Sequence, residues 1–121
     1  MASLFGHEDG LLSVCFHPVD EDMLALGCPF ANLTQELAGS DPVFREPLFA
    51  IFFEWKRGIM AGVRKSQEIG EGRRDVDPED VAIFIICAIE GIWAMAKASR
   101  CREHFEASHR GLVHYLESMR A

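Results

Sequence analysis

The sequence predicts an all-α protein whose helices form one bundle. After residue 26 the apolar residues recur every three or four positions, which is the spacing of one face of an α-helix. No strand-like alternation occurs in this part of the chain, and two Asp-Pro pairs, at 41–42 and 77–78, mark helix starts. The chain has 121 residues, of which 49% are hydrophobic, so one domain can bury a core without disulfides or a metal.

The first long helix is expected over Pro42–Ile69. Proline suits the first helical position because it has no N–H to leave unpaired, and Gly70 is placed to end the helix. Five aromatic residues within twelve positions exceed what one buried stripe needs, and such side chains readily line an apolar cavity. The apolar residues of this helix include Phe44, Leu48, Phe49, Ile51, Phe52, Phe53, Trp55, Ile59, Met60 and Val63.

The second long helix is expected over Pro78–Ser99, with Asp77 as its cap. From residue 81 to residue 98 only Glu90 and Lys97 are charged, so apolar residues occur all round the helix. A membrane span would need about 20 uninterrupted apolar residues, and Glu90 interrupts this stretch at its centre. We therefore expect the helix to be buried between the protein's own core and a second subunit, and not in a membrane.

A third helix is expected over Cys101–Met119, with a narrow apolar seam of the kind that packs helix against helix. The seam consists of Phe105, Leu112, Leu116 and Met119. A short helix is expected over Pro29–Ala38. Residues 1–26 are interpreted as a short acidic N-terminal segment with one helical turn at Met23–Leu26, and residues 27–121 as the helical domain. Leu11, Leu12, Val14 and Phe16 of that segment are expected to cover the apolar side of the first long helix.

The net charge of -7 lies entirely in the first third of the chain. Residues 1–44 contain seven acidic residues and no Lys or Arg, whereas residues 45–121 contain twelve residues of each sign. This distribution argues against an N-terminal basic arm that binds nucleic acid. The four cysteines form no CxxC pair and no signal peptide precedes them, so we expect reduced thiols in a cytoplasmic protein.

Catalytic and metal-binding motifs are absent from the sequence, which has no GxGxxG, P-loop, GxSxG or HExxH. His104, His109 and His114 are spaced by five residues and therefore do not share a helix face. Glu106-x-x-His109 matches one half of a di-iron motif whose second half is missing. We expect no enzyme activity, no cofactor and no metal; a small enzyme or metal carrier that uses Glu106, His109 and Cys101 is the alternative hypothesis.

A small-molecule pocket is expected between the two long helices. Glu90 is a lone carboxylate in an apolar run, so it is either paired with a basic residue or serves as the polar anchor of a ligand. A cysteine in such a run more often fills space than reacts. The residues expected to line the pocket are Phe49, Phe52, Trp55, Ile59, Phe84, Cys87, Glu90 and Trp93.

The stretch Gly27–Ala38, with the sequence GCPFANLTQELA, resembles a segment that opens the regulatory half of many TetR-family transcriptional regulators. That segment has the pattern glycine-cysteine, then asparagine-leucine, then glutamate-leucine. Further likenesses follow in order over residues 27–120. They are Asp41-Pro42, a long helix with Trp55, Glu68-Ile69-Gly70-Glu71, Asp77-Pro78-Glu79 and Ala88-Ile89-Glu90-Gly91. Their common order and spacing make the resemblance specific.

The resemblance implies an effector-binding and homodimerising regulatory domain of a transcriptional repressor. In such proteins the last two long helices form a four-helix bundle with those of a partner, and a small, usually apolar effector binds in a helical cavity. These helices would be Pro78–Ser99 and Cys101–Met119. The dimer interface expected here consists of Ile85, Ile89, Ile92, Phe105, Leu112, Leu116 and Met119.

The helix-turn-helix domain of that family has no counterpart in the sequence. Residues 1–26 are too few for three helices and contain no basic residue to neutralise phosphates. We therefore expect a regulatory-domain fragment or a headless relative that does not bind DNA by itself. The alternative is a headless dimerisation module that has no ligand pocket and pairs with an intact regulator.

Overall fold

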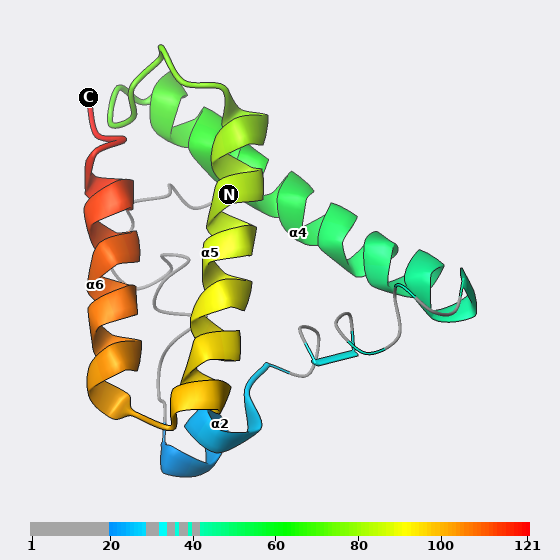
Figure 1. Ribbon diagram of the computed structural model, residues 1–121. Coiled ribbons are helices and arrows are strands. Elements are labelled where there is room, and N and C mark those ends of the chain that lie inside the picture. The colour runs from blue at the N-terminus through cyan, green and yellow to red at the C-terminus, as the bar shows by residue number, and fades with distance from the viewer. Residues whose placement is uncertain (1–19, 29–31, 34–35, 37–38, 40–41) are drawn as a thin grey trace.

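The computed structural model describes residues 20–28, 32–33, 36, 39 and 42–121. Four helices form this part of the chain: α2 (Glu21–Leu26), α4 (Pro42–Glu68), α5 (Pro78–Ser99) and α6 (Arg102–Glu117) (Figure 1). These residues contain no strand, and their one β-bridge joins Gly72 to Arg120. The all-α prediction is confirmed.

Helix α5 lies at the centre of the fold, and α2, α4 and α6 all pack against it. Helix α6 runs beside α5 in the opposite direction, and α2 packs at the C-terminal end of α5 (Figure 1). Helix α4 crosses the N-terminal part of α5, and its own N-terminal half then projects away from the α5–α6 pair. The central position of α5 explains why its sequence is apolar on several sides.

The helix bounds agree closely with the sequence prediction because local signals determine them. The Asp77 side chain accepts a hydrogen bond of 2.8 Å from the Glu79 N–H and so caps α5. Gly70, just beyond α4, has a φ of 81°, in the left-handed region where glycine is favoured. Arg100 also has a positive φ, of 50°, so the chain turns there and α6 begins at Arg102.

Several predicted features lie outside the described residues. They are the apolar residues Leu11, Leu12, Val14 and Phe16, the cap residue Asp41, and most of the expected helix Pro29–Ala38. The helical turn expected at Met23–Leu26 is described, and it belongs to α2.

The core lies between α5 and its three neighbours. Ile85 of α5 is 0% exposed, and Val63 of α4 and Leu116 of α6 are buried against the same cluster. Leu24 of α2 is 1% exposed and joins this cluster. Packing is therefore continuous across residue 26, where the sequence placed the start of the helical domain.

The loop between α4 and α5 is tied to the C-terminal end of the chain. The Arg73 N–H donates to the Met119 carbonyl at 2.8 Å, and the Ala121 N–H donates to the Glu71 carbonyl at 2.9 Å. Gly72 lies between these bonds, and a Cβ there would come within 3.0 Å of the Ser66 Cβ. These contacts hold the ends of α4 and α6 together at the end of the bundle opposite α2 (Figure 1).

Candidate functional site

Helix α5 carries two surfaces beside its core line. Ile85, Ile89 and Ile92 form this line, at steps of four and three residues, and all three are buried. Successive residues of a helix are 100° apart, so positions to either side of the line face different neighbours. One side borders a groove along α6, and the other side carries Glu90 and meets the segment that contains Cys28.

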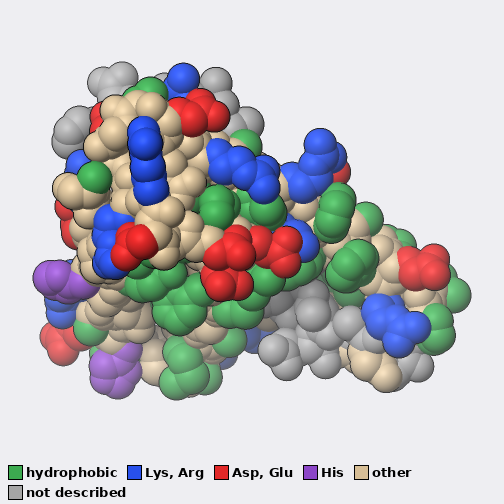
Figure 2. All heavy atoms as spheres, turned by 90° about the horizontal axis from the view of Figure 1, so that it is seen from above, with side chains coloured by type: hydrophobic (Ala, Val, Ile, Leu, Met, Phe, Trp, Pro, Cys, Tyr) green, Lys and Arg blue, Asp and Glu red, His purple; other side chains and the backbone are tan. Residues whose placement is uncertain are grey.

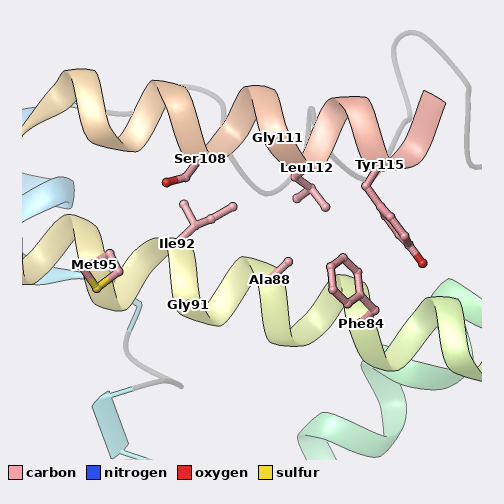
Figure 3. A pocket seen from close by; sticks show the side chains of 9 residues that line it. All are labelled: Phe84, Ala88, Gly91, Ile92, Met95, Ser108, Gly111, Leu112 and Tyr115. Carbon is pink, nitrogen blue, oxygen red and sulfur yellow. The ribbon is translucent and has the colours of Figure 1, made fainter. Parts of the chain in front are cut away.

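The first surface, which we call the α5–α6 groove, runs along the outside of the two helices and has a volume of about 390 Å³ (Figure 3). Its middle is formed by small residues, Ala88, Gly91 and Gly111, which leave room for another helix to approach. The residues that line it are Phe84, Ala88, Gly91, Ile92 and Met95 of α5 and Ser108, Gly111, Leu112 and Tyr115 of α6.

Large side chains mark the two ends of the groove. Phe84 and Tyr115 lie together at one end, with ring centroids 4.4 Å apart, and Met95 lies at the other end (Figure 3). Phe84 is 50% exposed and Met95 is 61% exposed. The groove therefore presents apolar surface to solvent in the isolated chain.

Most residues of the expected dimer interface are buried within the chain itself. Six of the seven residues are buried in the chain's own core, because they face the helices of the same protomer, and Met119 packs against that core in a half-buried position. These six are Ile85, Ile89, Ile92, Phe105, Leu112 and Leu116. Of them, Ile92 and Leu112 also reach the floor of the groove. The groove side of the same two helices carries their exposed apolar residues Phe84 and Met95.

The sequence does contain a signal for the groove. Its α5 residues, Phe84, Ala88, Gly91 and Met95, follow steps of four, three and four, and its α6 residues, Ser108, Gly111 and Tyr115, follow steps of three and four. This is the spacing of a helix–helix seam. It was missed because alanine, glycine and serine do not stand out as hydrophobic residues.

The second surface, which we call the Glu90 site, consists of Glu90 of α5 and Cys28 of the segment that follows α2. The Cys28 Sγ donates a weak hydrogen bond to Glu90 Oε1, with a sulfur–oxygen distance of 3.8 Å. Glu90 Oε2 is buried and has no hydrogen-bond partner among the described residues. Burial raises the pKa of Glu90, and the hydrogen bond from Cys28 opposes this shift.

A basic partner for Glu90, one of the two alternatives from the sequence, is not found among the described residues. Lys97 lies on the same side of α5, and its Nζ donates to Asn32 Oδ1 at 3.2 Å. Asn32 in turn donates to the Leu26 carbonyl at 2.9 Å. These contacts hold the start of the connecting segment against α5 beside Glu90.

The α4 residues predicted for the pocket lie along one face of the helix. Phe52, Trp55 and Ile59 follow steps of three and four, and Ile59 is buried in the core cluster. Phe52 is half-buried against the same cluster, whereas Trp55 is partly exposed. In Figure 1 the N-terminal half of α4 diverges from α5.

The remaining predicted pocket residues lie elsewhere. Phe84 lines the α5–α6 groove, and Trp93 is buried with its ring 5.2 Å from the Phe105 ring. Cys87 is exposed on the outer side of α5. Phe49 is 61% exposed on the projecting half of α4, where Figure 2 shows hydrophobic side chains beside charged ones.

The histidines of α6 form no metal site in the described part of the chain, where no three potential ligands lie together. In Figure 2 they lie at the edge of the molecule farthest from the projecting half of α4. His104 and His114 are exposed.

Comparison with known proteins gives a consistent result. Residues 10–112 match a family model described as "Tetracyclin repressor-like, C-terminal domain". The chain is 32% identical over 88 residues to the HTH-type transcriptional repressor DhaR of Mycobacterium sp. (strain GP1). That match covers 73% of the chain and 44% of the repressor, so the chain spans less than half the length of this curated relative.

Two solved structures share the fold. A TetR-family transcriptional regulator from Cytophaga hutchinsonii superposes with a TM-score of 0.75 at 19% identity, over 92% of this chain and 64% of that protein. A TetR transcriptional regulator from Chloroflexus aurantiacus J-10-FL superposes with a TM-score of 0.77 at 25% identity, over 98% of this chain and 63% of that protein.

Proposed function

Because the chain belongs to the TetR family of transcriptional regulators, as a C-terminal domain, we propose that it is the effector-binding and homodimerising part of a transcriptional repressor. The observation that carries this proposal is the α5–α6 groove, an apolar surface formed by two adjacent helices and open to solvent. An open apolar groove with small residues in its middle is suited to a second helix pair.

The composition of α5 supports a second copy of the chain as the occupant of the groove. This helix is long and apolar enough to pass for a membrane span, yet less than half of its apolar stretch is buried within the chain. Glu90 lies within that stretch, where a charged group would be costly in lipid. A partner's α5 and α6 would instead cover Phe84 and Met95, and a stable dimer would bury more than about 1,000 Å² in total.

The Glu90 site is the proposed place for the effector. It lies on the side of α5 opposite to the groove, so a ligand there would touch α5 and α4 without competing with the partner subunit. Because α5 belongs to both surfaces, a shift of this helix on ligand binding would reach the dimer partner. The proposed effector is a small molecule with an apolar body, because the proposal assigns the aromatic residues Phe52 and Trp55 of α4 to one wall of the site.

DNA binding is not proposed for these 121 residues. All net negative charge lies before Arg45, and residues 45–121 are balanced, so the sequence has no net positive charge to attract phosphates. In the proposal the contact with DNA belongs to a helix-turn-helix domain outside this sequence. The place of action is the cytoplasm, as for a soluble regulator.

A dimerisation module without an effector is the second proposed function. It is favoured by the fact that α5 and α6 supply the whole groove, with no contribution from the Glu90 site. Such a chain would pair with an intact regulator through the same groove and would block it.

Light scattering on the purified chain tests the proposal. We expect a mass of twice the 13.6 kDa of one chain at micromolar concentration. A clean monomer at high micromolar concentration would rule out the homodimerising function, because that function requires the groove to be occupied by a second copy of the chain.

A further inference from the structure

Met95 is a strongly exposed methionine that lines the α5–α6 groove. Its side chain is 61% exposed, and it lies at the end of the groove opposite to the ring pair of Phe84 and Tyr115 (Figure 3). A thioether is apolar and adapts well to irregular apolar surfaces, but oxidation converts it to a polar sulfoxide. Met95 therefore places an oxidisable group in the surface that a second copy of the chain is proposed to cover.

The other described methionines differ from Met95 in exposure or in place. Met60 and Met119 are half-buried against the core cluster, so a peroxide reaches their sulfur atoms less easily. Met23 is 39% exposed, but it lies on α2 and outside the groove. Among the described methionines we therefore expect Met95 and Met23 to be oxidised first in the isolated chain, and of these two only Met95 belongs to the groove.

The groove offers few hydrogen-bond donors to a sulfoxide oxygen. Of the side chains that line it, only those of Ser108 and Tyr115 carry a donor. The Ser108 hydroxyl already donates to the His104 carbonyl at 2.9 Å, and Tyr115 lies at the opposite end from Met95 (Figure 3). A sulfoxide oxygen covered at the Met95 end would lose its hydrogen bonds to water without gaining others from its own protomer, which is unfavourable.

We propose that Met95 is an oxidative modification site that regulates dimerisation. A peroxide transfers one oxygen atom to the Met95 sulfur of the monomer: a sulfur–oxygen bond forms, the peroxide O–O bond breaks, and the departing oxygen takes the proton as water or an alcohol. The sulfur is thereby oxidised by two electrons and the peroxide is reduced. The sulfoxide then keeps a second copy out of the groove. This inference rests on the proposed homodimer and names a way in which it is regulated.

The dimer is expected to protect Met95 from oxidation because the partner covers its sulfur. Met95 should be oxidised several-fold more slowly at chain concentrations where the dimer dominates than where the monomer dominates, whereas Met23 should be oxidised at one rate throughout. Hydrogen peroxide is added in large excess, and mass spectrometry of tryptic peptides measures sulfoxide formation at each methionine. Light scattering on the same samples gives the oligomeric state.

The oxidised chain is expected to dimerise about tenfold or more weakly than the untreated chain. Sedimentation velocity measures the dissociation constant after the peroxide has been removed and the sample has been treated with dithiothreitol. This treatment reduces disulfides and sulfenic acids of the cysteines and leaves the methionine sulfoxide. Incubation with methionine sulfoxide reductases is expected to restore the dimer.

Two variants at Met95 separate its oxidation from other effects of peroxide. Met95→Leu keeps an apolar side chain of similar volume and is expected to give a dimer whose dissociation constant does not change with peroxide. Met95→Gln places a polar group at the same position and is expected to weaken the dimer about tenfold without peroxide. Met23→Leu is the matched control, and its dimer is expected to remain sensitive to peroxide.

The outcomes separate this inference from the proposed homodimer. A dimer that survives full oxidation of Met95, or a Met95→Leu dimer that weakens with peroxide as much as the wild type, overturns the regulatory role of Met95 and leaves the homodimer in place. Equal oxidation rates of Met95 in monomer and dimer would show that the partner does not cover this residue, and they overturn the inference as well. A chain that is monomeric at every concentration overturns the homodimer itself, and this inference with it.

Discussion

The phenol ring of Tyr115 lies against the benzene ring of Phe84, with centroids 4.4 Å apart and ring planes inclined by 47°. This pair joins α6 to α5 at one end of the α5–α6 groove (Figure 3). Burial, with a smaller contribution from the negative charge of Asp80, raises the pKa of Tyr115. Half of Phe84 remains exposed, so the pair is an apolar ridge that a second molecule can cover.

Replacing Phe84 with alanine is expected to weaken dimerisation by about tenfold or more, because exposed aromatic residues in a groove contribute strongly to interfaces. Sedimentation velocity over a dilution series measures the change in dimer dissociation constant. Phe49→Ala is the matched control, because Phe49 is equally an exposed phenylalanine but lies on α4, away from the groove. A similar loss in both variants would remove Phe84 from the interface.

Ile85 and Ile83 lie two residues apart on α5, and the fold predicts that truncating Ile85 costs much more stability than truncating Ile83. Ile85→Ala is expected to lower the free energy of unfolding by about 2–5 kcal/mol, because the side chain is fully buried. Ile83→Ala is expected to cost less than about 1 kcal/mol, because Ile83 is at the surface. Urea unfolding followed by circular dichroism measures both values. Equal costs would show that α5 is rotated relative to the described packing.

Glu90→Gln is expected to leave stability near neutral pH unchanged or to raise it. The folded-state pKa of Glu90 is raised by burial, so the folded chain holds this proton more tightly than the unfolded chain. The wild type therefore gains stability as the pH falls from the raised pKa towards 4.5, and the difference between wild type and variant shrinks in that window. Melting temperatures near pH 7 and near pH 5 measure it. A variant that melts several degrees lower near pH 7 would indicate a positive partner for Glu90.

Two glycines are expected to respond in opposite ways to alanine. At Gly58, in the interior of α4, a Cβ would meet no atom within 4 Å, so Gly58→Ala should raise stability by about 0.5–1 kcal/mol through helix propensity. At Gly72 a Cβ would come within 3.0 Å of the Ser66 Cβ and 3.3 Å of its backbone carbon, so Gly72→Ala should lower stability. Thermal melting distinguishes the two signs. A stabilising Gly72→Ala would mean that the loop between α4 and α5 is not held against α4.

Local signals made the helices predictable from the sequence. Asp77 and Pro78 mark the start of α5, and Gly70 marks the end of α4, through interactions that involve residues within a few positions. Such signals do not depend on the rest of the fold. For this reason the predicted range Pro78–Ser99 is also the observed one.

The rotation of α5 was not predictable in the same way. When a helix is apolar on several sides, its sequence does not show which side faces the core of the same chain. We therefore expected Ile85, Ile89 and Ile92 at the dimer interface, and the structure has them in the core of the chain. Phe84 was assigned to the ligand pocket for the same reason and lies in the groove. The contact between Glu90 and Cys28 joins positions 62 residues apart. It could not be predicted from the periodicity of the sequence, which relates only residues of the same helix.

The most direct test of the central claim is the oligomeric state of two glycine variants. Gly91 lies in the middle of the groove and Gly58 lies on the outer side of α4; both are exposed, and a Cβ at either would meet no atom within 4 Å. Replacing either glycine with glutamate makes the same change in size and charge. A difference in oligomeric state between the two variants therefore depends on where the glutamate lies.

A glutamate in the middle of the groove would bury an unpaired charge in the dimer, whereas a glutamate at Gly58 would stay in water. The account predicts that light scattering gives a dimer for wild type and Gly58→Glu, at twice the 13.6 kDa chain mass, and a helical monomer for Gly91→Glu. A Gly91→Glu chain that remains dimeric, or a wild-type chain that is monomeric at high micromolar concentration, would contradict it.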